Sequence, residues 1–261
     1  MKVSSKILLF FLFFSLIFWL LRTANSGELV LTDIRDLGGV PWLYSAICLI
    51  FSILAAFTIQ KEWENWNQIV AATKGEVGAA RELWLWSRDL SLDNEKTILH
   101  CLEDYLTVTI AEWSATKQAE RSEACGKTCG TLRRAIIELR EDEARVHLLN
   151  LFHEMIQNRN KRFDQSANRI PHILKNTLIF TDVPVIVLSL FIGVRNPFVD
   201  YVFTLSIGVL AYTIYMVIDD LDNPFKPGSW YLTPDDYRSL LDKMRGDSPS
   251  SGPETGVYPM N

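Results

Sequence analysis

Four long apolar stretches constrain this chain more than any other feature of its sequence. They run from Ile7 to Leu21, from Trp42 to Gln60, from near Ile173 to Val194, and from Phe198 to Ile218. A helix rises about 1.5 Å per residue, so about 20 apolar residues cross a hydrocarbon core of ~30 Å. Lipid offers the backbone no hydrogen-bond partner, and each crossing segment must therefore be helical. The sequence predicts an all-α fold with four transmembrane helices in two pairs.

The first stretch admits two interpretations. As a helix it would reach only ~22 Å, so a retained helix must also recruit the residues around Lys2 and Lys6, with the lysines extending toward the headgroups. Alternatively, residues 1–26 are a cleaved signal peptide, with Ala24-Asn25-Ser26 as the small-residue cleavage site. The topology of the remaining chain is the same under both interpretations.

The apolar stretches divide the chain into five segments. The first transmembrane pair lies in residues 1–60 and the second in residues 173–218, with a polar region of long helices at 61–172 between them. A C-terminal segment follows at 219–245. Residues 246–261 are rich in Ser, Pro and Gly, a composition typical of disordered chains.

Apolar residues recur near a 3.6-residue period through the polar region, which predicts amphipathic helices there. The period continues from Glu62 to Asp89, so the second transmembrane helix is expected to continue out of the membrane without a break. Further helices are expected from Thr97 to Trp113 and from Thr131 to Phe163. Most of the charged side chains on the opposite faces are interpreted as a solvated surface.

Positive charges gather at one set of helix ends. Lys6 precedes the first stretch, Lys61 follows the second, Arg169 precedes the third and Lys226 follows the fourth. By the positive-inside rule, both termini and the polar middle region are cytoplasmic and the loop at 22–40 is outside. The predicted location is the cell membrane, with the lipid bilayer as a partner.

Charge and motifs exclude several function classes. The chain has 26 Lys and Arg against 31 Asp and Glu, and a net charge of −5 gives no basic surface for nucleic acid. No phosphate-binding glycine loop and no nucleophile with an adjacent base is found. We therefore expect neither an enzyme nor a cofactor.

Two cysteines raise the question of a metal site. Cys125 and Cys129 are four residues apart, which places them on one face of a helix. Together with His147 or His153 they would offer zinc ligands. Two thiols at this spacing are a weak zinc signal, and small buried thiols between helices are the favoured interpretation. We expect no metal.

Asp182 is the polar residue placed deepest in the third stretch. It lies about 9 residues, or ~14 Å, from the start of that helix. A carboxylate at this depth is costly in lipid, so it should face protein or water. A functional intramembrane site and a structural polar contact both remain open interpretations.

An acidic junction directly follows the fourth stretch. It comprises Asp219, Asp220 and Asp222, followed by Asn223, Pro224 and Phe225. Negative charge at a helix C-terminus opposes the helix dipole, so these carboxylates need a compensating contact. The candidates are a salt bridge to Arg159, Arg162 or Arg169, or a bound divalent cation. Three carboxylates are few for calcium, which favours the salt bridge.

Three segments carry a family resemblance: the acidic junction with its Pro-Phe, residues 57–66 with Trp63 and Trp66, and residues 168–171 with Ile170-Pro171. Together they resemble the bestrophin family of anion channels, and more closely the bestrophin-like prokaryotic membrane proteins related to it. The acidic junction with its Pro-Phe is similar to the element after the last transmembrane helix of bestrophins. Residues 57–66 resemble the stretch where their pore helix becomes a tryptophan-bearing cytosolic helix, and residues 168–171 resemble the Ile-Pro before their third helix. The resemblance covers roughly residues 46–241.

The resemblance implies a homo-oligomer, a pentamer in bestrophins, that passes small anions through a pore lined by the second transmembrane helix. The candidate pore-lining residues are Ile47, Ile50, Phe51, Leu54 and Phe57. Apolar residues at helical spacing more commonly form contacts between helices. The alternative function is a non-conducting membrane scaffold or sensor whose cytoplasmic helices bind a partner. The acidic run is shorter than in calcium-regulated bestrophins, which argues against calcium control.

Overall fold

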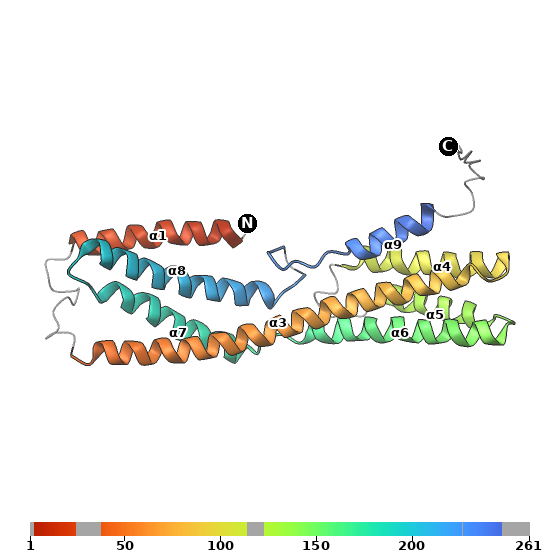
Figure 1. Ribbon diagram of the computed structural model, residues 1–261, viewed down its shortest axis with the longest axis horizontal. Coiled ribbons are helices and arrows are strands. Elements are labelled where there is room, and N and C mark those ends of the chain that lie inside the picture. Colours follow the sequence, from red (N-terminus) through yellow and green to blue (C-terminus); the bar gives the residue numbers. More distant parts are fainter. Residues whose placement is uncertain (1–2, 25–37, 114–122, 226, 247–261) are drawn as a thin grey trace, which may run out of the picture. The chain divides into compact units, whose positions relative to one another are not determined.

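The computed structural model describes residues 3–24, 38–113, 123–225 and 227–246, and these residues form helices and no strand (Figure 1). The chain divides into two compact units. Unit 1 comprises Met1–Trp66 and Arg169–Tyr231, and unit 2 comprises Asn67–Asn168 and Leu232–Asn261. The prediction of an all-α fold is confirmed.

Unit 1 contains the apolar helices. They are α1 (Val3–Ala24), the first part of α3 (Val40–Ser87), α7 (His172–Phe191) and α8 (Pro197–Leu221). Among the described residues, these four helices are long and apolar enough to cross a membrane. Each coincides with one of the four apolar stretches, because a backbone in hydrocarbon satisfies its own hydrogen bonds only as a helix.

The core of unit 1 joins α3, α7 and α8. Phe51 and Ala55 on α3 pack with Val185 on α7 and with Ala211 and Ile218 on α8. The two last helices are joined by a short turn, in which the Asn196 side chain accepts hydrogen bonds from the first backbone N–H groups of α8 and Pro197 occupies the first helical position. The predicted tight hairpin between the third and fourth stretches is confirmed.

Helix α1 packs closely against α8. A Cβ atom on Gly208 would lie 2.4 Å from the Phe14 ring, so glycine is required for this approach. At the end of α1, the Arg22 guanidinium donates to both carboxylate oxygens of Asp200, at 2.7 and 3.1 Å, and to the Leu190 carbonyl at 2.9 Å. These contacts, which the sequence did not indicate, attach the end of α1 to α8 and to the end of α7.

Helix α3 is one unbroken helix of 48 residues. The prediction that the helix of the second apolar stretch continues into the polar region without a break is confirmed. Its later part belongs to unit 2, where Ile69, Ala80 and Leu83 are fully buried. A single helix therefore contributes to the cores of both units.

Unit 2 packs four further helices around the later part of α3. They are α4 (Leu92–Ala111), α5 (Glu123–Ile137), α6 (Asp142–Ala167) and α9 (Asp235–Gly246). Helix α4 begins five residues before the predicted start at Thr97, directly after the turn at Ser91.

The prediction of one helix from Thr131 to Phe163 is wrong, because the chain breaks between α5 and α6. Leu139 is buried at the break, and the Arg145 guanidinium donates to its carbonyl at 3.2 Å. Asp142 and Glu143 then occupy the first turn of α6, where acidic side chains favour a new helix. No Gly or Pro marks this break in the sequence, and the bond from Arg145 to the Leu139 carbonyl is a local contact across it.

A buried ion pair holds the centre of unit 2. The Arg162 guanidinium on α6 donates to both carboxylate oxygens of Glu76 on α3, at 2.9 and 3.1 Å, and the Tyr105 hydroxyl on α4 donates to the same carboxylate. The rings of Trp113 and Tyr237 lie over the guanidinium, at 5.1 and 5.8 Å from its carbon. Burial and the nearby Glu76 raise the pKa of Tyr105 well above its ordinary value, so the phenol stays a donor.

Truncating Arg162 alone should damage unit 2 more than removing the whole ion pair. Arg162→Met leaves the Glu76 carboxylate buried without its cation, and we expect the free energy of unfolding to fall by ~3–5 kcal/mol. The double variant Arg162→Met/Glu76→Leu buries no charge, so much of this loss should be recovered. Urea unfolding of the detergent-solubilised protein, followed by tryptophan fluorescence, measures both variants. Equal losses in the two would contradict this account.

Candidate functional site

The predicted pore-lining residues lie on two different faces of α3. Ile50 and Phe57 are exposed, with 53% and 69% of their surface accessible, whereas Phe51 is buried in the core of unit 1. Ile47 and Leu54 are partly buried against that core. The exposed face also includes Ile53, which sits four residues before Phe57 and was not among the predicted residues. The exposed fractions therefore divide these residues into an outward-facing stripe and a set that packs against other helices. The spacing of the residues in the sequence did not make this distinction.

Asp182 is buried within α7. Its residue is 7% exposed, and its Oδ1 atom has no hydrogen-bond partner among the described residues. Pro184 follows two positions later inside the same helix. The carboxylate faces protein, as its depth in the third stretch predicted, and the structure places no cation beside it within the part of the chain that is described.

The acidic junction is held by a lysine. The Lys175 ammonium on α7 lies 2.7 Å from Asp219 Oδ1 and 3.6 Å from Asp222 Oδ2. Asp222 also accepts a hydrogen bond from the Ile170 backbone N–H at 3.0 Å. The end of α8 is thereby attached to the start of α7, and the charge opposing the helix dipole is compensated from the neighbouring helix.

Asp220 shapes the turn that follows α8. Its Oδ2 accepts from the backbone N–H of Ser229 at 2.7 Å and of Trp230 at 3.4 Å. A Cβ atom on Gly228 would lie 1.7 Å from Asp220 Oδ1, so only glycine permits this approach. The Trp66 indole on α3 donates to the Trp230 carbonyl at 3.0 Å. The turn therefore also contacts α3 where that helix leaves the apolar stretch.

The compensating contact is a salt bridge, as expected, but its cation was not among the three predicted arginines. Arg162 pairs with Glu76 instead, and Arg159 lies beside the thiols described below. Lys175 was missed because it stands inside the third apolar stretch, one helical turn from its start. Glu62 was also missed: it is 1% exposed, and neither carboxylate oxygen has a hydrogen-bond partner among the described residues.

The two cysteines of α5 form a buried pair. The Cys125 thiol contacts the Thr109 hydroxyl on α4 at 3.7 Å, and the Arg159 guanidinium on α6 donates to Cys129 Sγ at 3.7 Å. The hydrogen bond from Cys129 and the positive charge of Arg159 lower the pKa of Cys125 to about 6, although burial opposes them. The pKa of Cys129 is raised by its hydrogen bond to Cys125 and by burial, so Cys125 is the more acidic thiol of the pair.

The two histidines that the sequence offered as zinc ligands contact other side chains. The His147 ring packs 4.1 Å from the Trp86 ring, and the His153 Nε2 contacts the Gln157 amide. Within the described ranges, no group of three or more His, Cys, Asp or Glu side chains is arranged to hold a metal ion.

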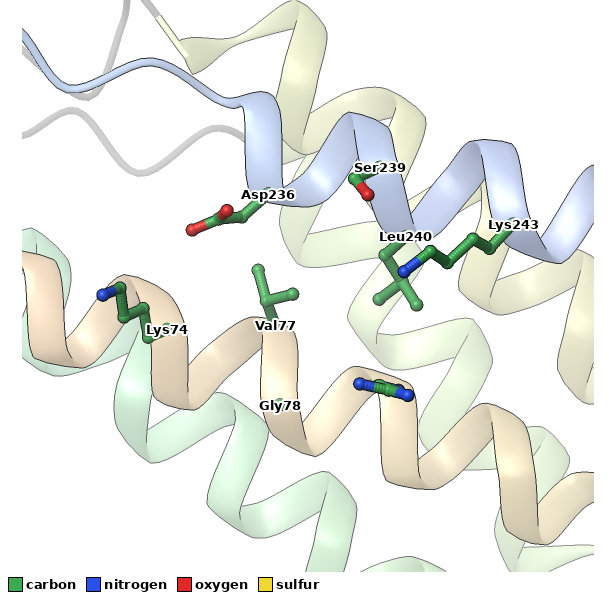
Figure 2. A pocket seen from close by; sticks show the side chains of 8 residues that line it. Lys74, Val77, Gly78, Asp236, Ser239, Leu240 and Lys243 are labelled. Atoms are coloured by element: carbon green, nitrogen blue, oxygen red, sulfur yellow. The ribbon is translucent and has the colours of Figure 1, made fainter.

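A pocket of about 310 Å³ opens between α3 and α9 within unit 2 (Figure 2). Lys74 and Val77 on α3 face Asp236 and Leu240 on α9, with Lys243 toward the other end of the pocket in this view. The lining side chains are Lys74, Val77, Gly78, Arg81, Asp236, Ser239, Leu240 and Lys243. Three cations against one carboxylate make the pocket electropositive, a property suited to an acidic ligand.

Comparisons with known proteins agree with this architecture. A family model of the bestrophin-like domain matches residues 8–231. The zinc-phased crystal structure of a bacterial bestrophin homologue from Klebsiella pneumoniae is similar, with a TM-score of 0.71 at 15% identity over 95% of this chain and 100% of that chain. A single-residue variant of that homologue gives 0.70 at 16% identity over 93% and 98%. A search of curated proteins found no significant match.

The acidic junction should be stabilised by Lys175 and not by calcium. Asp219→Asn and Lys175→Met should each lower the free energy of unfolding by ~0.5–1 kcal/mol, as for a partly exposed pair, and the double variant should lose little more than either. The losses should be the same in calcium and in a calcium chelator. Melting temperatures in both buffers measure this, with Asp242→Asn on α9 as the charge-matched control. A loss that appears only with calcium would overturn the salt-bridge account.

Proposed function

Because the chain belongs to the family of bestrophin-like membrane proteins, we propose that it forms a homo-oligomeric anion channel whose pore is lined by α3. Five copies around an axis is the arrangement that the resemblance to bestrophins implies. The observation that carries the proposal is the outward apolar stripe on α3, a helix that continues unbroken from the apolar stretch into unit 2.

The outward stripe supplies the constriction. Ile50, Ile53 and Phe57 are exposed in the single chain and recur at three- and four-residue spacing, so they lie along one face of the helix. The segment from Trp42 to Gln60 carries no charged side chain. A pore lined by this face controls anions through the cost of wetting and partial dehydration, and not through a fixed charged site.

Two sets of contacts hold α3 for this role. On its inner face, Phe51 and Ala55 pack against α7 and α8. The opposite face of the helix is therefore available to contact other copies of the chain. At the cytoplasmic end, Trp63 and Trp66 stack with ring centres 5.4 Å apart, and Trp66 donates to the turn held by Asp220. The acidic junction positions the pore helix in this proposal and does not bind the permeating ion.

A second candidate function rests on the electropositive pocket between α3 and α9. None of Lys74, Arg81 and Lys243 forms an ion pair within the described residues. Three such cations in one pocket of a cytoplasmic region suit the binding of an acidic partner. Binding such a partner is what a scaffold or sensor would do. A channel and a partner-binding region are compatible, and the conductance experiment below separates the conducting from the non-conducting case.

Shortening the side chain at the outward stripe should change conduction. Phe57→Ala widens an apolar constriction and lowers the cost of wetting it, so single-channel conductance should rise in planar bilayers containing the purified oligomer. Two matched controls use the same substitution. Phe51→Ala, in the inner core of α3, should lower the melting temperature without the same rise, and Phe203→Ala, exposed on α8, should leave conductance unchanged.

The controls decide between the candidate functions. A rise in all three variants would remove α3 as the pore lining. Bilayers that stay silent with folded, oligomeric wild type and Phe57→Ala protein would remove the channel proposal and leave the partner-binding function.

The topology gives a separate test in intact cells. Both termini and the polar middle region should be cytoplasmic, so an impermeant thiol reagent should not label Lys96→Cys, near Asn94 on α4, until the membrane is opened. Asp33→Cys, in the loop expected outside, should be labelled at once. The comparison is made with Cys48 and Cys101 replaced by Ser, and labelling of Lys96→Cys in intact cells would contradict the orientation.

A further inference from the structure

We propose that Cys125 and Cys129 form a dithiolate site for a single soft, two-coordinate cation, with Cu(I) as the ion whose chemistry fits. The two thiols lie where α4, α5 and α6 meet, and both residues are less than a tenth exposed. Cu(I) prefers thiolate sulfur over oxygen ligands. This inference stands independently of the channel proposal.

The helical spacing of the cysteines sets a distance that suits a bridging ion. Side chains at positions i and i+4 of a helix have Cβ atoms about 5–6 Å apart. A disulfide needs Cβ atoms roughly 3.5–4.5 Å apart, so direct oxidation of Cys125 and Cys129 would distort α5. An ion placed between the two sulfur atoms spans the larger separation and leaves the helix intact.

Arg159 supplies the charge that such a complex requires. A Cu(I) ion held by two thiolates carries a net charge of −1, and a buried anion needs a nearby cation. The Arg159 guanidinium already contacts Cys129 Sγ, at 3.7 Å, and the residue is 8% exposed. Its Nε–H has no acceptor among the described residues. The guanidinium therefore has a donor that no described residue uses.

Charge and protons balance when the ion binds. Two Cu–S bonds form, and each proton that the thiols still hold leaves to solvent, so the complex of Cu(I) with two thiolates carries a net charge of −1. No sulfur is oxidised and copper keeps its valence.

Zinc makes a useful comparison ion. Structural Zn²⁺ is held by four protein ligands, and a complex with two thiolates alone would leave half of its coordination to water. Within the residues that the structure describes, the pair supplies two sulfur ligands and no third His, Cys, Asp or Glu joins them. The site should therefore bind Cu(I) far more tightly than Zn²⁺.

The test is a titration of the purified full-length protein with Cu(I) under anaerobic, reducing conditions, in competition with a chromophoric Cu(I) chelator. We expect one Cu(I) per chain, unaffected by a tenfold excess of Zn²⁺. Cys125→Ser and Cys129→Ser should each weaken binding at least a hundredfold. The double variant Cys48→Ser/Cys101→Ser, which removes the two unpaired cysteines, should bind as the wild type does.

The role of Arg159 is tested by a charge-preserving comparison. Arg159→Gln should weaken Cu(I) binding about tenfold, and Arg159→Lys should restore most of it. If the serine variants fail to fold, alkylation of the wild type gives the answer by mass spectrometry: bound Cu(I) should protect Cys125 and Cys129 but not Cys101. Unchanged binding in the folded serine variants, equal affinity for Zn²⁺, or no protection of the pair would each overturn the proposal.

Discussion

The structure depends first on the backbone constraint that hydrocarbon imposes on α3. From Trp42 to Gln60 the chain has no water to bond with, so its N–H and C=O groups must pair within the helix. No proline follows before Ser87, and Gly75 and Gly78 lie inside the helix without ending it. The apolar part of α3 is therefore continued by a polar part that lies outside the lipid. Each part contributes buried residues to the core of its own unit.

Inside unit 2, polar groups replace part of the apolar core. Glu76 and Arg162 are buried where α3 and α6 meet, and each satisfies the other's charge with two hydrogen bonds. The thiols of Cys125 and Cys129 are buried against Arg159, one helical turn earlier on α6. Arginines one turn apart on α6 therefore donate to two kinds of acceptor, a carboxylate and a cysteine sulfur atom, within a helical bundle that is otherwise closely packed.

Patterns that lie within one helix could be predicted from the sequence, whereas contacts between helices could not. The apolar stretches and the continuation of α3 follow from periodicity, and the structure has them as predicted. The break before α6 has no Gly or Pro to mark it, and the residue at the break, Leu139, is buried in unit 2. Likewise, the bonding of Arg162 and Lys175 depends on which helices become neighbours. Most of the charges along this region were interpreted as a solvated surface, yet one of them, Arg162, is the most buried arginine among the described residues.

The carboxylates of the acidic junction find their partners within this chain. Asp219, Asp220 and Asp222 each direct a carboxylate oxygen to a donor of this chain: the Lys175 ammonium or a backbone N–H group. A divalent cation at this place would have to displace those donors, because calcium requires six to eight oxygen ligands. Lys175 thus supplies within the protein the positive charge that a bound ion would bring. The end of α8 is held to α7 by a contact that needs no ligand, so the turn that supports α3 is already formed in the single chain.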